Sequence, residues 1–352
     1  MNILVLGAGA QGRVIAADLA RSLESAGVTV ADLRRPDLPA LPNLHWVEAD
    51  LSDGAAAARL LRGCDLAVGA LPSRYGVAIM RAAIEARRNL VDVSFTPENP
   101  LALDAEARAA GIFILPDCGV APGLSHLLVG RAAAARGTPR EVTIMVGGVA
   151  QDPMRPMGYV VTWSLDDLLE EYTRPARIVR GGRPVEVPVF SGLEHVAVEG
   201  VGVMEAFYSD GLRTLIDSLP GVLEMGEKTL RWPGHVAAAW PLVKSGRFVE
   251  EIRARCTADP PEDLVALVVR LRWDDAGEET TLVDRYDPAT RLTAMARTTA
   301  LTTSACAQLA ASGIVRDTGV LPLERVGRDE RAFEFVRAAV ARHGIGMRTR
   351  VV

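Results

Sequence analysis

The chain has 352 residues, which is more than one hydrophobic core usually serves, so the length predicts two domains. Hydrophobic residues make up 49% of the sequence and charged residues 24%, as in globular proteins, which excludes a disordered or low-complexity chain. The net charge of −5 is spread along the chain without a basic stripe, which argues against nucleic acid as a partner.

Three further patterns bear on the compartment and on metals. No apolar run approaches the roughly 20 residues that span a bilayer, and the first residues are those of a strand rather than of a signal peptide. We therefore expect a cytoplasmic protein without a membrane partner. Clustered Cys and His residues and a HExxH motif are absent, so no metal site is expected. Four widely spaced cysteines are expected to be reduced and mostly buried, namely Cys64, Cys118, Cys256 and Cys306.

The first third of the chain alternates short apolar runs with helical patterns. Residues 3–6 form a buried strand, a glycine-rich loop follows, and a helix is expected from 11 to 26. Strands alternating with helices at this spacing favour a doubly wound parallel sheet. The further strands are expected at 28–31, 45–47, 65–68, 89–93 and 112–115, and the further helices at 54–62, 76–87 and 101–110.

The loop between the first strand and the first helix matches a dinucleotide-binding motif. Gly7 allows a tight turn, Gly9 lets the backbone approach a pyrophosphate, and Gly12 allows close packing of helix on strand. The first turn of the helix offers free N–H groups and a favourable dipole to the anion. This motif, in this context, is typical of a Rossmann domain. The loop residues expected to hold the cofactor are Gly7, Gly9, Ala10, Gln11 and Gly12.

Asp32 stands at the end of the second strand, twenty residues beyond Gly12. Its carboxylate can accept hydrogen bonds from the ribose hydroxyls of NAD, and its charge repels the 2′-phosphate of NADP. Arg34 and Arg35 follow directly and could hold that phosphate. The sequence therefore favours NAD and leaves NADP open.

Further cofactor-binding residues are expected where other strands end. Asp50 follows the third strand and either lies near the adenine or caps the next helix. Ala70, Leu71 and Pro72 end the fourth strand, where small residues let the nicotinamide half of the cofactor pass the sheet edge. Asp92 lies at the end of the next strand along the chain.

The pattern changes after residue 123. Residues 141–146 form a strand, 147–157 are irregular, and the strands 264–273 and 280–286 are joined by a hairpin loop. These features predict a second, α+β domain built on a mixed or antiparallel sheet. Helices at 298–311 and 330–342 are expected to return to the first domain. The expected domains are therefore 1–122 completed by 297–352, and 123–296 for substrate binding and dimer formation.

Several segments in combination resemble one enzyme family. They include the glycine loop 7–12 and the segments 91–100, 116–123, 162–164, 171–176, 205–215 and 229–235. Together these segments are similar to the saccharopine dehydrogenase-like family, with the greatest likeness to its short L-lysine 6-dehydrogenases. The segment 191–202 is the least similar to that family.

The resemblance implies a Rossmann domain completed by C-terminal helices and a mixed α/β catalytic domain that also forms a homodimer. It implies oxidation of the ε-amine of L-lysine by NAD, with release of ammonia. The family also contains enzymes that form or split a secondary amine such as saccharopine. Because these enzymes share one fold, the fold itself does not separate the substrates.

Amine oxidation needs a group that takes a proton before hydride leaves. Asp117 is the first candidate, because it follows a strand of the parallel sheet at its carboxyl end. Glu98 and Asp92 are second candidates beyond the neighbouring strand. His235 is a candidate proton shuttle. Each has a structural alternative: Asp117 as a turn residue, Glu98 as a helix cap, and His235 as a histidine bonded to the backbone.

A substrate α-carboxylate calls for an arginine, whose guanidinium can bind it through two hydrogen bonds. Arg213 and Arg231 lie in the most family-like segments of the second domain, and the alternative for each is a salt bridge within that domain. Tyr208, Trp163 and Tyr159 could line a pocket for an aliphatic chain, although aromatic residues near strands are more often core residues.

Three hypotheses follow. The first is an NAD-dependent oxidoreductase that deaminates L-lysine or a close analogue. The second is a saccharopine-type dehydrogenase or reductase, whose substrate has more carboxylates and should meet more arginines. The third is a non-catalytic dinucleotide-binding sensor. Such a sensor would not need the second-domain residues that the chain carries, so the sequence favours an enzyme.

Overall fold

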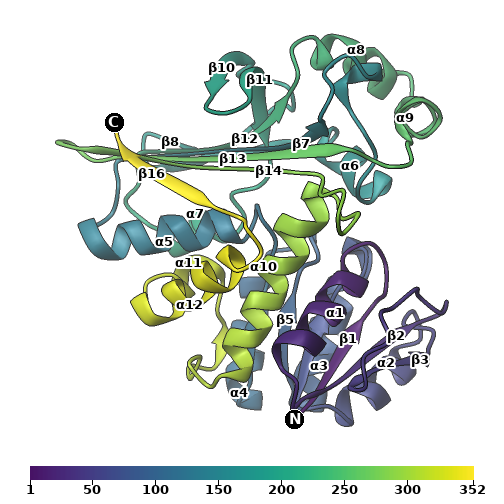
Figure 1. The fold of residues 1–352 in the computed structure, drawn as a ribbon. Coiled ribbons are helices and arrows are strands. Elements are labelled where there is room, and N and C mark those ends of the chain that lie inside the picture. The colour runs from purple at the N-terminus through teal and green to yellow at the C-terminus, as the bar shows by residue number, and fades with distance from the viewer. The chain divides into compact units, whose positions relative to one another are not determined.

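The computed structural model describes all 352 residues, and the chain forms two compact units. The first unit holds residues 1–131 and 299–343, and the second holds 132–298 and 344–352. Two of the three boundaries fall within helices, α5 (Leu124–Arg136) and α10 (Ala294–Ala311), and the third follows His343. Each unit contains one sheet (Figure 1).

The sheet of the first unit is parallel throughout, as predicted from the alternation of strands and helices. Its central strands are short, apolar and buried, which suits strands covered on both faces. The strand order reverses between β1 and β4, which is the point where doubly wound sheets bind ligands. In spatial order the strands are β15 (Gly319–Val320), β6 (Phe113–Leu115), β5 (Asn89–Asp92), β4 (Leu66–Gly69), β1 (Asn2–Leu6), β2 (Gly27–Asp32) and β3 (Leu44–Glu48).

Helices cover this sheet on the two faces that alternate side chains of each strand present. Leu4 and Leu6 of β1 pack with Leu61, Met80 and other side chains of the helices that follow β3, β4 and β5. These helices are α2 (Gly54–Arg62), α3 (Ser73–Ala86) and α4 (Asp104–Ala110), the last preceded by the 3₁₀ turn Pro100–Leu103.

Side chains of the C-terminal segment form polar contacts with the first helix, α1 (Gly12–Ser22). Asp18 of α1 is buried and accepts hydrogen bonds from Ser304 Oγ at 2.6 Å and Gln308 Nε2 at 3.2 Å, both on α10. Its other oxygen lies 3.1 Å from His343 Nε2. Residues 299–343 thus complete the first unit, together with α11 (Leu323–Val326) and α12 (Glu330–Ala341).

The sheet of the second unit is mixed, because β12 runs parallel to β7 and antiparallel to β11. The rest of the sheet is antiparallel, including the predicted hairpin of β13 and β14. Its main path is β10 (Glu194–Val198), β11 (Gly202–Ser209), β12 (Glu224–Arg231), β7 (Glu141–Ala150), β13 (Asp263–Arg272), β14 (Gly277–Arg285) and β16 (Met347–Val351), with β8 (Ala176–Arg180) and β9 (Arg183–Val187) attached through β12.

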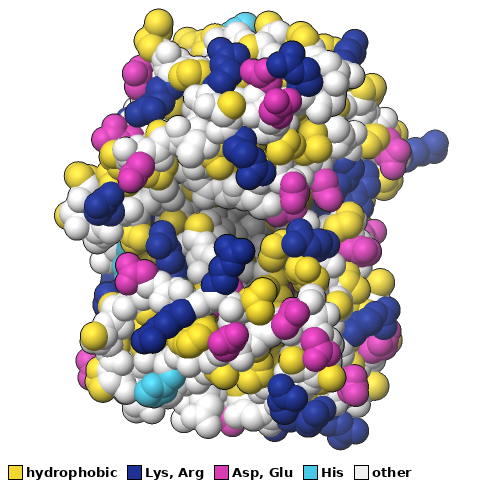
Figure 2. Space-filling model, turned by 90° about the vertical axis from the view of Figure 1, so that its right-hand side faces the viewer, with side chains coloured by type: hydrophobic (Ala, Val, Ile, Leu, Met, Phe, Trp, Pro, Cys, Tyr) yellow, Lys and Arg dark blue, Asp and Glu magenta, His cyan; other side chains and the backbone are white.

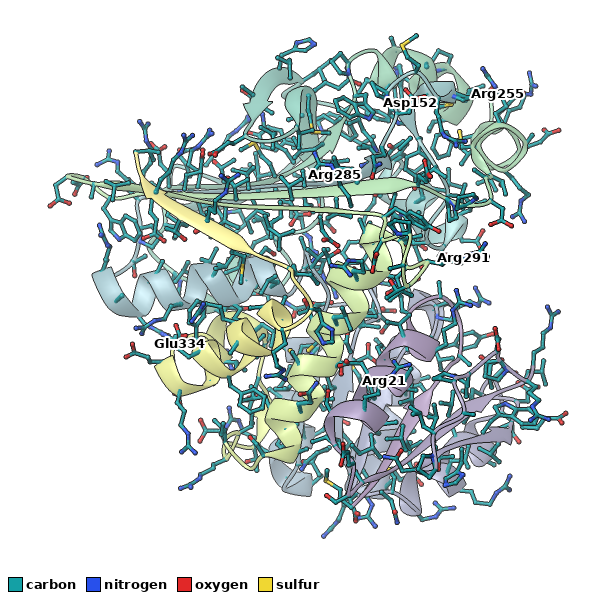
Figure 3. All side chains as sticks on the ribbon, in the orientation of Figure 1. Arg21, Asp152, Arg255, Arg285, Arg291 and Glu334 are labelled. Atoms are coloured by element: carbon teal, nitrogen blue, oxygen red, sulfur yellow. The ribbon has the colours of Figure 1, made fainter.

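The hairpin of β10 and β11 folds over one face of this sheet. Val198 and Met204 pack there against Met145 of β7 and Leu264 of β13. Arg285, labelled in Figure 3, donates from Nη2 to the carbonyl of Gly200 in the hairpin turn at 2.8 Å. The sheet is therefore strongly curled, with an apolar core inside the curl.

A second core lies where short helices meet the sheet. Tyr159, Tyr172, Phe207 and Phe248 are fully buried there. The helices are α6 (Leu165–Glu171), α8 (His235–Lys244) and α9 (Phe248–Cys256), with the 3₁₀ turn Pro156–Gly158, while α7 (Leu215–Ser218) follows β11 elsewhere in the unit.

Two parts of this fold depart from the sequence prediction. The last nine residues were expected in the first domain, but β16 pairs with β14 of the second unit from Glu278↔Val351 to Leu282↔Met347. β7 also continues to Ala150, through residues expected to be irregular, because it pairs with β13 along its whole length. The strands β8 and β12 and the helix α9 were not predicted, whereas α8 begins at His235, where a helix was expected.

One face of the molecule, seen in Figure 2, is not dominated by one sign of charge. On the face shown in Figure 2, lysine and arginine side chains alternate with aspartate and glutamate. None of the helices combines the length with the apolar composition that crossing a bilayer requires.

Candidate functional site

The glycine loop has the backbone geometry that its motif requires. Gly7 has a positive φ of 101°, and a Cβ there would lie 2.6 Å from the carbonyl oxygen of Ala70. A Cβ on Gly12 would lie 2.0 Å from the carbonyl oxygen of Gly7, so both positions exclude any other residue. A Cβ on Gly9 would meet nothing within 4 Å. Gly9 therefore faces open space, into which a ligand can approach the backbone.

The first turn of α1 keeps its donors available. No side chain caps this helix, and the amides of Ala10, Gln11 and Gly12 have no acceptor within the protein. The side-chain Oε1 of Gln11 is buried and has no hydrogen-bond partner. Free amides at a helix N-terminus bind anions such as a pyrophosphate, so these residues fit a dinucleotide.

Asp32 is fixed against the glycine loop. Its Oδ2 accepts from the amide of Ala8 at 2.7 Å, and its Oδ1 accepts from the amide of Arg34 at 3.0 Å. Each carboxylate oxygen can accept a second hydrogen bond, so Asp32 can still receive a ribose hydroxyl. Arg34 and Arg35 are exposed, and the guanidinium of Arg35 lies 5.8 Å from the ring centre of Trp46 on β3.

Asp50 is a turn residue in the protein alone. Its Oδ1 accepts from the amide of Ser52 at 2.9 Å and from its hydroxyl at 2.6 Å, and these bonds lower the pKa of Asp50. The helix cap is Asp53, which accepts from Ala55 N, so the alternative of Asp50 as the cap of α2 is wrong. Asp50 remains exposed at the end of the loop after β3.

The segment 70–72 lies beside the glycine loop. The amide of Ala70 donates to the carbonyl of Leu6 at 2.8 Å, and Pro72 precedes α3 directly. The residues expected to border the nicotinamide therefore stand at the carboxyl ends of β1 and β4, where the strand order reverses.

Asp92 ends β5 and Asp117 follows the adjacent strand β6, and the two residues are 1% and 4% exposed. The amide of Cys118 donates to the carbonyl of Asp92 at 2.8 Å, which joins the two segments. Burial raises the pKa of Asp92 to about 7, and the nearby Asp117 adds to that rise. A buried carboxyl that titrates near neutrality at the edge of a ligand-binding sheet is a candidate acid or base.

The backbone of Asp117 adopts an uncommon conformation. Its φ is 55°, in the left-handed region, within a turn closed by Gly123. A Cβ on Gly123 would lie 2.6 Å from the carbonyl oxygen of Asp117, so the turn packs tightly. Glu98, in contrast, is exposed, and Asn99 caps the following 3₁₀ turn by accepting from Leu101 N. The alternative of Glu98 as a helix cap is wrong.

In the second unit, His235 and Arg231 meet at Tyr172. Arg231 Nε donates to the Tyr172 hydroxyl at 2.7 Å, and that hydroxyl lies 2.7 Å from His235 Nε2. His235 Nδ1 lies 2.8 Å from the carbonyl of Met157 and must donate to it, so Nε2 accepts from Tyr172. Burial and the neighbouring Arg231 lower the pKa of His235 to about 3. A neutral, fully bonded histidine matches the structural alternative better than a proton shuttle.

Arg231 also uses its remaining nitrogens within the protein. Nη1 donates to the carbonyl of Leu230 at 2.9 Å, and Nη2 lies 3.5 Å from Glu171 Oε1. The guanidinium lies 5.5 Å from the ring centres of both Tyr159 and Tyr172. Because Arg231 is 3% exposed, this arrangement favours the salt-bridge alternative over binding of a substrate carboxylate.

Tyr159 and Trp163 belong to the same cluster, since Trp163 Nε1 donates to the Tyr159 hydroxyl at 3.0 Å. Tyr159 is buried, whereas Trp163 is only half-buried. Tyr208 lies elsewhere, with its ring against the α-carbons of Gly192 and Gly226 and 4.7 Å from Lys228 Nζ. The structure thus brings four of the predicted side chains together and leaves Tyr208 apart.

Arg213 lies in the loop between β11 and α7. It is 2% exposed and has a φ of 50°. Two buried hydroxyls at the ends of this loop, Ser209 Oγ on the last residue of β11 and Thr214 Oγ1, have no hydrogen-bond partner. Asp210 is held separately by Arg177, with 2.9 Å between Oδ1 and Nε. Buried hydroxyls without partners are costly unless a ligand or water satisfies them, which makes this loop a candidate binding segment.

Three residues that lie around Arg231 were not predicted to be site residues. Tyr172 joins Arg231 to His235, and Glu171 also accepts a hydrogen bond from the hydroxyl of Thr229. Glu205 is buried and accepts from the amides of Gly234 at 3.0 Å and Val236 at 2.6 Å, at the start of α8. Only the register of β11 with β12, which pairs Glu205 with Arg231, could have indicated this grouping.

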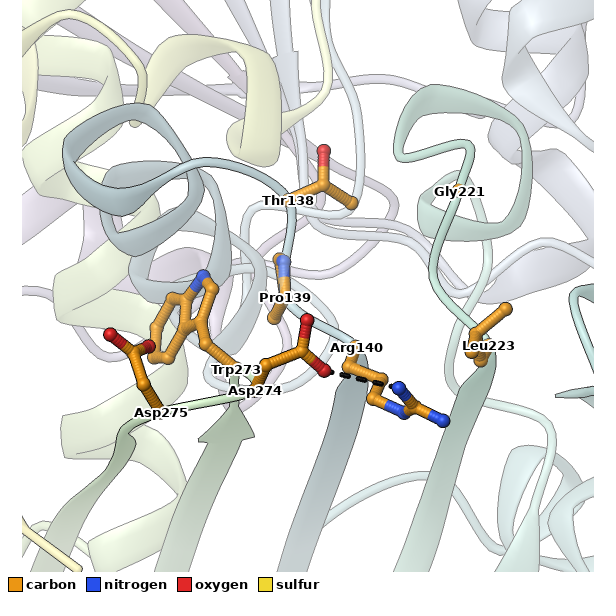
Figure 4. A pocket seen from close by; sticks show the side chains of 8 residues that line it. All are labelled: Thr138, Pro139, Arg140, Gly221, Leu223, Trp273, Asp274 and Asp275. Carbon is orange, nitrogen blue, oxygen red and sulfur yellow. Dashed lines mark hydrogen bonds and ion pairs between the residues drawn. The ribbon is translucent and has the colours of Figure 1, made fainter.

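A separate surface pocket of about 380 Å³ lies at one end of the second sheet (Figure 4). Its charged residues pair with each other, as Arg140 Nη1 and Asp274 Oδ1 are 3.0 Å apart. No group of three or more His, Cys, Asp and Glu side chains is arranged to hold a metal ion. The pocket is lined by Thr138, Pro139, Arg140, Gly221, Leu223, Trp273, Asp274 and Asp275.

Comparison with known proteins agrees with this organisation. Residues 3–115 match the family model described as the saccharopine dehydrogenase NADP binding domain, and residues 119–345 match the saccharopine dehydrogenase C-terminal domain. The solved structure of apo saccharopine dehydrogenase (L-Glu forming) from Saccharomyces cerevisiae has the same fold. Its TM-score is 0.77 at 17% identity, over 100% of this chain and 99% of that chain.

Curated relatives are similar over part of their length. Saccharopine dehydrogenase [NADP(+), L-glutamate-forming] from Schizosaccharomyces pombe is 26% identical over 196 residues, which are 53% of this chain and 43% of that enzyme. The α-aminoadipic semialdehyde synthase of Arabidopsis thaliana is 24% identical over 42% of this chain and 14% of its own. The chain thus spans less than half the length of these relatives in the matches. Since the two family models together span nearly the whole sequence, the chain belongs to the saccharopine dehydrogenase family.

Proposed function

We propose that the chain is an oxidoreductase that uses a nicotinamide dinucleotide to oxidise, or in reverse to form, a carbon–nitrogen bond of an amino-acid substrate. The observation that carries the proposal is the joint presence of an open dinucleotide cradle and a buried carboxyl pair in one unit. A sensor that only binds the cofactor has no need of a carboxyl that titrates near neutrality beside the cradle. Membership of a family of dehydrogenases supports the same function.

The preferred substrate class is a secondary amine of the saccharopine type. This choice rests on the relatives, whose names describe saccharopine dehydrogenases that form L-glutamate with NADP. The same names favour NADP, which Arg34 and Arg35 could bind through its 2′-phosphate. Asp32 opposes that choice, so the cofactor preference depends on which of these side chains dominates.

A simple amino acid such as L-lysine is the second candidate, for a specific reason. Saccharopine carries more carboxylates than lysine and should meet more arginines. Arg231 is bonded internally, and Arg174 and Arg177 pair with Asp210. Arg213, the other arginine predicted to bind substrate, lies in sequence between the two hydroxyls without partners and could bind a single α-carboxylate. One such arginine would suit a substrate with one carboxylate.

The residues divide the chemistry as follows. The bound dinucleotide supplies the acceptor or donor of hydride. The glycine loop and the first turn of α1 hold its pyrophosphate, and Asp32 orients its ribose. In the second unit, hydrogen bonds join Arg231, Tyr172 and His235, and His235 supplies no proton at neutral pH because it stays neutral.

The decisive experiment measures reduced cofactor at 340 nm for the purified chain with NAD or NADP. The amines are saccharopine, L-lysine, L-ornithine and simple diamines. Saccharopine with NADP is expected to give the highest kcat/KM, and a preference for lysine would select the second candidate. If none of these amines gives reduced cofactor, the proposed function is wrong. The variant Arg213→Ala should raise KM for lysine but not for cadaverine, and Arg180→Ala serves as a control arginine.

A further inference from the structure

Two carboxyl groups share a buried position in the first unit. Asp92 is the last residue of β5, Asp117 follows β6, and these strands are neighbours in the parallel sheet. The segments touch through the bond from Cys118 N to the carbonyl of Asp92. Two carboxylates so placed repel each other, and a shared environment of this kind keeps a proton on one of them.

The two oxygens of Asp92 have different surroundings. Oδ1 accepts from the amide of Ser94 at 2.8 Å and also from the Ser94 hydroxyl. Oδ2 has no hydrogen bond and lies against Gly69 at the end of β4, where a Cβ would be only 1.9 Å from it. Asp92 is thus held by one oxygen, and its other oxygen remains able to accept a proton.

The electrostatic surroundings set the proton affinity of Asp92. Burial raises its pKa to about 7, the bonds from Ser94 oppose the rise, and the charge of Asp117 adds to it. The other titratable neighbour is Cys118, whose pKa burial raises well above that of a free thiol, so it stays neutral. Asp92 therefore holds its proton for part of the time at neutral pH, which suits a base that must accept and return protons.

We propose that Asp92 is the base that removes the proton from the ammonium group of the substrate, an inference that rests on the proposed function. The N–H bond breaks, its electron pair stays on nitrogen, and the proton moves to Oδ2 of Asp92. The dinucleotide held by the glycine loop would supply the acceptor for the hydride that the carbon gives up as the nitrogen lone pair forms the C=N bond. Asp117 acts as a positioning residue, because its charge adds to the rise in the proton affinity of Asp92 that burial causes.

Binding of the cofactor without any substrate should already change the protonation of Asp92. Ligands of doubly wound sheets bind beyond the carboxyl ends of the strands, where Asp92 lies. The oxidised nicotinamide ring carries a positive charge and the reduced ring does not. A positive charge near a carboxyl favours its ionised form. Binding of NADP⁺ should therefore displace the Asp92 proton, whereas binding of NADPH should leave it in place.

The test measures proton release by the full-length protein, in weakly buffered solution with a pH indicator at pH 7. Wild type should release about half a proton per bound NADP⁺ and essentially none per NADPH. Asp92→Asn, saturated with NADP⁺, should release none, because asparagine cannot ionise. Ser94→Ala removes bonds that favour the charged carboxyl, so its release should peak at a higher pH. Asp117→Asn should move the peak to a lower pH.

These outcomes decide the proposal even if no amine is oxidised. Equal release with both cofactors, or unchanged release from Asp92→Asn, would overturn it, as would a failure of the chain to bind either dinucleotide. If Asp92→Asn does not fold, the opposite shifts of Ser94→Ala and Asp117→Asn carry the test. Where an amine substrate is found, Asp92→Asn should lower kcat at least about 100-fold and abolish the limb of the kcat/KM profile near pH 7.

Discussion

Removing the charge of Asp32 should change the preference of the chain between NAD and NADP. When NAD is bound, the carboxylate of Asp32 can accept a hydrogen bond from a ribose hydroxyl, and losing a hydrogen bond to a charged group costs about 1.5–3 kcal/mol. When NADP is bound, the same carboxylate faces the 2′-phosphate of the cofactor. Two unit charges 4 Å apart interact by about 1 kcal/mol in water and about 4 kcal/mol near a protein surface. Asp32 is half-buried, so relief of about 1–2 kcal/mol is expected.

Both changes act in the same direction on the ratio of the two affinities. Together they amount to at least about 2.5 kcal/mol, or on the order of 100-fold in favour of NADPH over NADH. The assay is fluorescence titration of NADH and NADPH with wild type, Asp32→Asn and Asp32→Ala. Asparagine keeps an acceptor for the amide of Ala8, which Oδ2 now binds at 2.7 Å, so it separates charge from support of the loop. A ratio that shifts less than threefold in Asp32→Asn would refute this account of cofactor selection.

Two further predictions concern the cradle and the second unit. Gly12→Ala should abolish dinucleotide binding and lower the melting temperature, because its Cβ would lie 2.0 Å from the Gly7 carbonyl oxygen. Gly9→Ala should weaken binding alone, with Gly54→Ala as a neutral control, and a Gly9→Ala protein that binds NADPH normally would contradict the open cradle. Because the pKa of His235 is lowered to about 3, the unfolded chain binds more protons than the folded one between that pH and about 6.5. The free energy of unfolding of the second unit should therefore fall as pH falls through this window, by up to about 1.4 kcal/mol per pH unit from this group. Denaturation followed by tryptophan fluorescence should show a shallower slope in His235→Gln, and an unchanged slope would contradict the buried neutral state.

Local signals were sufficient to predict the first unit. The strand at Asn2–Leu6, the glycine loop and the helix after it lie within about twenty residues, and each carries its own pattern of apolar residues and glycines. Parallel strands bring their carboxyl ends to one edge, so Asp92 and Asp117 could be expected near each other from their positions beyond neighbouring strands. The helix bounds erred by a few residues, as at Gly12–Ser22, because helix ends depend on capping contacts.

The second unit depends on contacts that sequence patterns do not reveal. β12 contains Glu227 and Lys228, and a strand with adjacent charges is not expected in the middle of a sheet. Lys228 is nevertheless buried there, because Glu194 and the carbonyl of Gly192 accept its hydrogen bonds. Those partners lie more than thirty residues away. The strand could be recognised only with its partners in place.

The same limit applies to the substrate-binding residues. Arg231 and His235 were predicted from their residue types, which suit carboxylate binding and proton transfer. The hydroxyl of Tyr172, some sixty residues earlier in the chain, makes hydrogen bonds with both side chains and so occupies the atoms that a substrate would need. A residue type states what a side chain can do, whereas its partners determine what remains available to a substrate.

Because Arg231 already makes hydrogen bonds within the protein, it is a poor candidate for binding the carboxylate of a substrate. A buried guanidinium that already donates to Tyr172 and Leu230 would have to give up those bonds to bind a ligand, and would leave polar groups unpaired in the core. The loop of Ser209 and Thr214 has the opposite character, because its two buried hydroxyls gain bonds when a ligand enters. Substrate recognition is therefore favoured at this loop, which also carries Arg213. Substitutions in this loop should therefore change the KM for saccharopine and the KM for lysine by different factors. Substitution of Arg231 should instead lower the stability of the protein, whichever substrate is used.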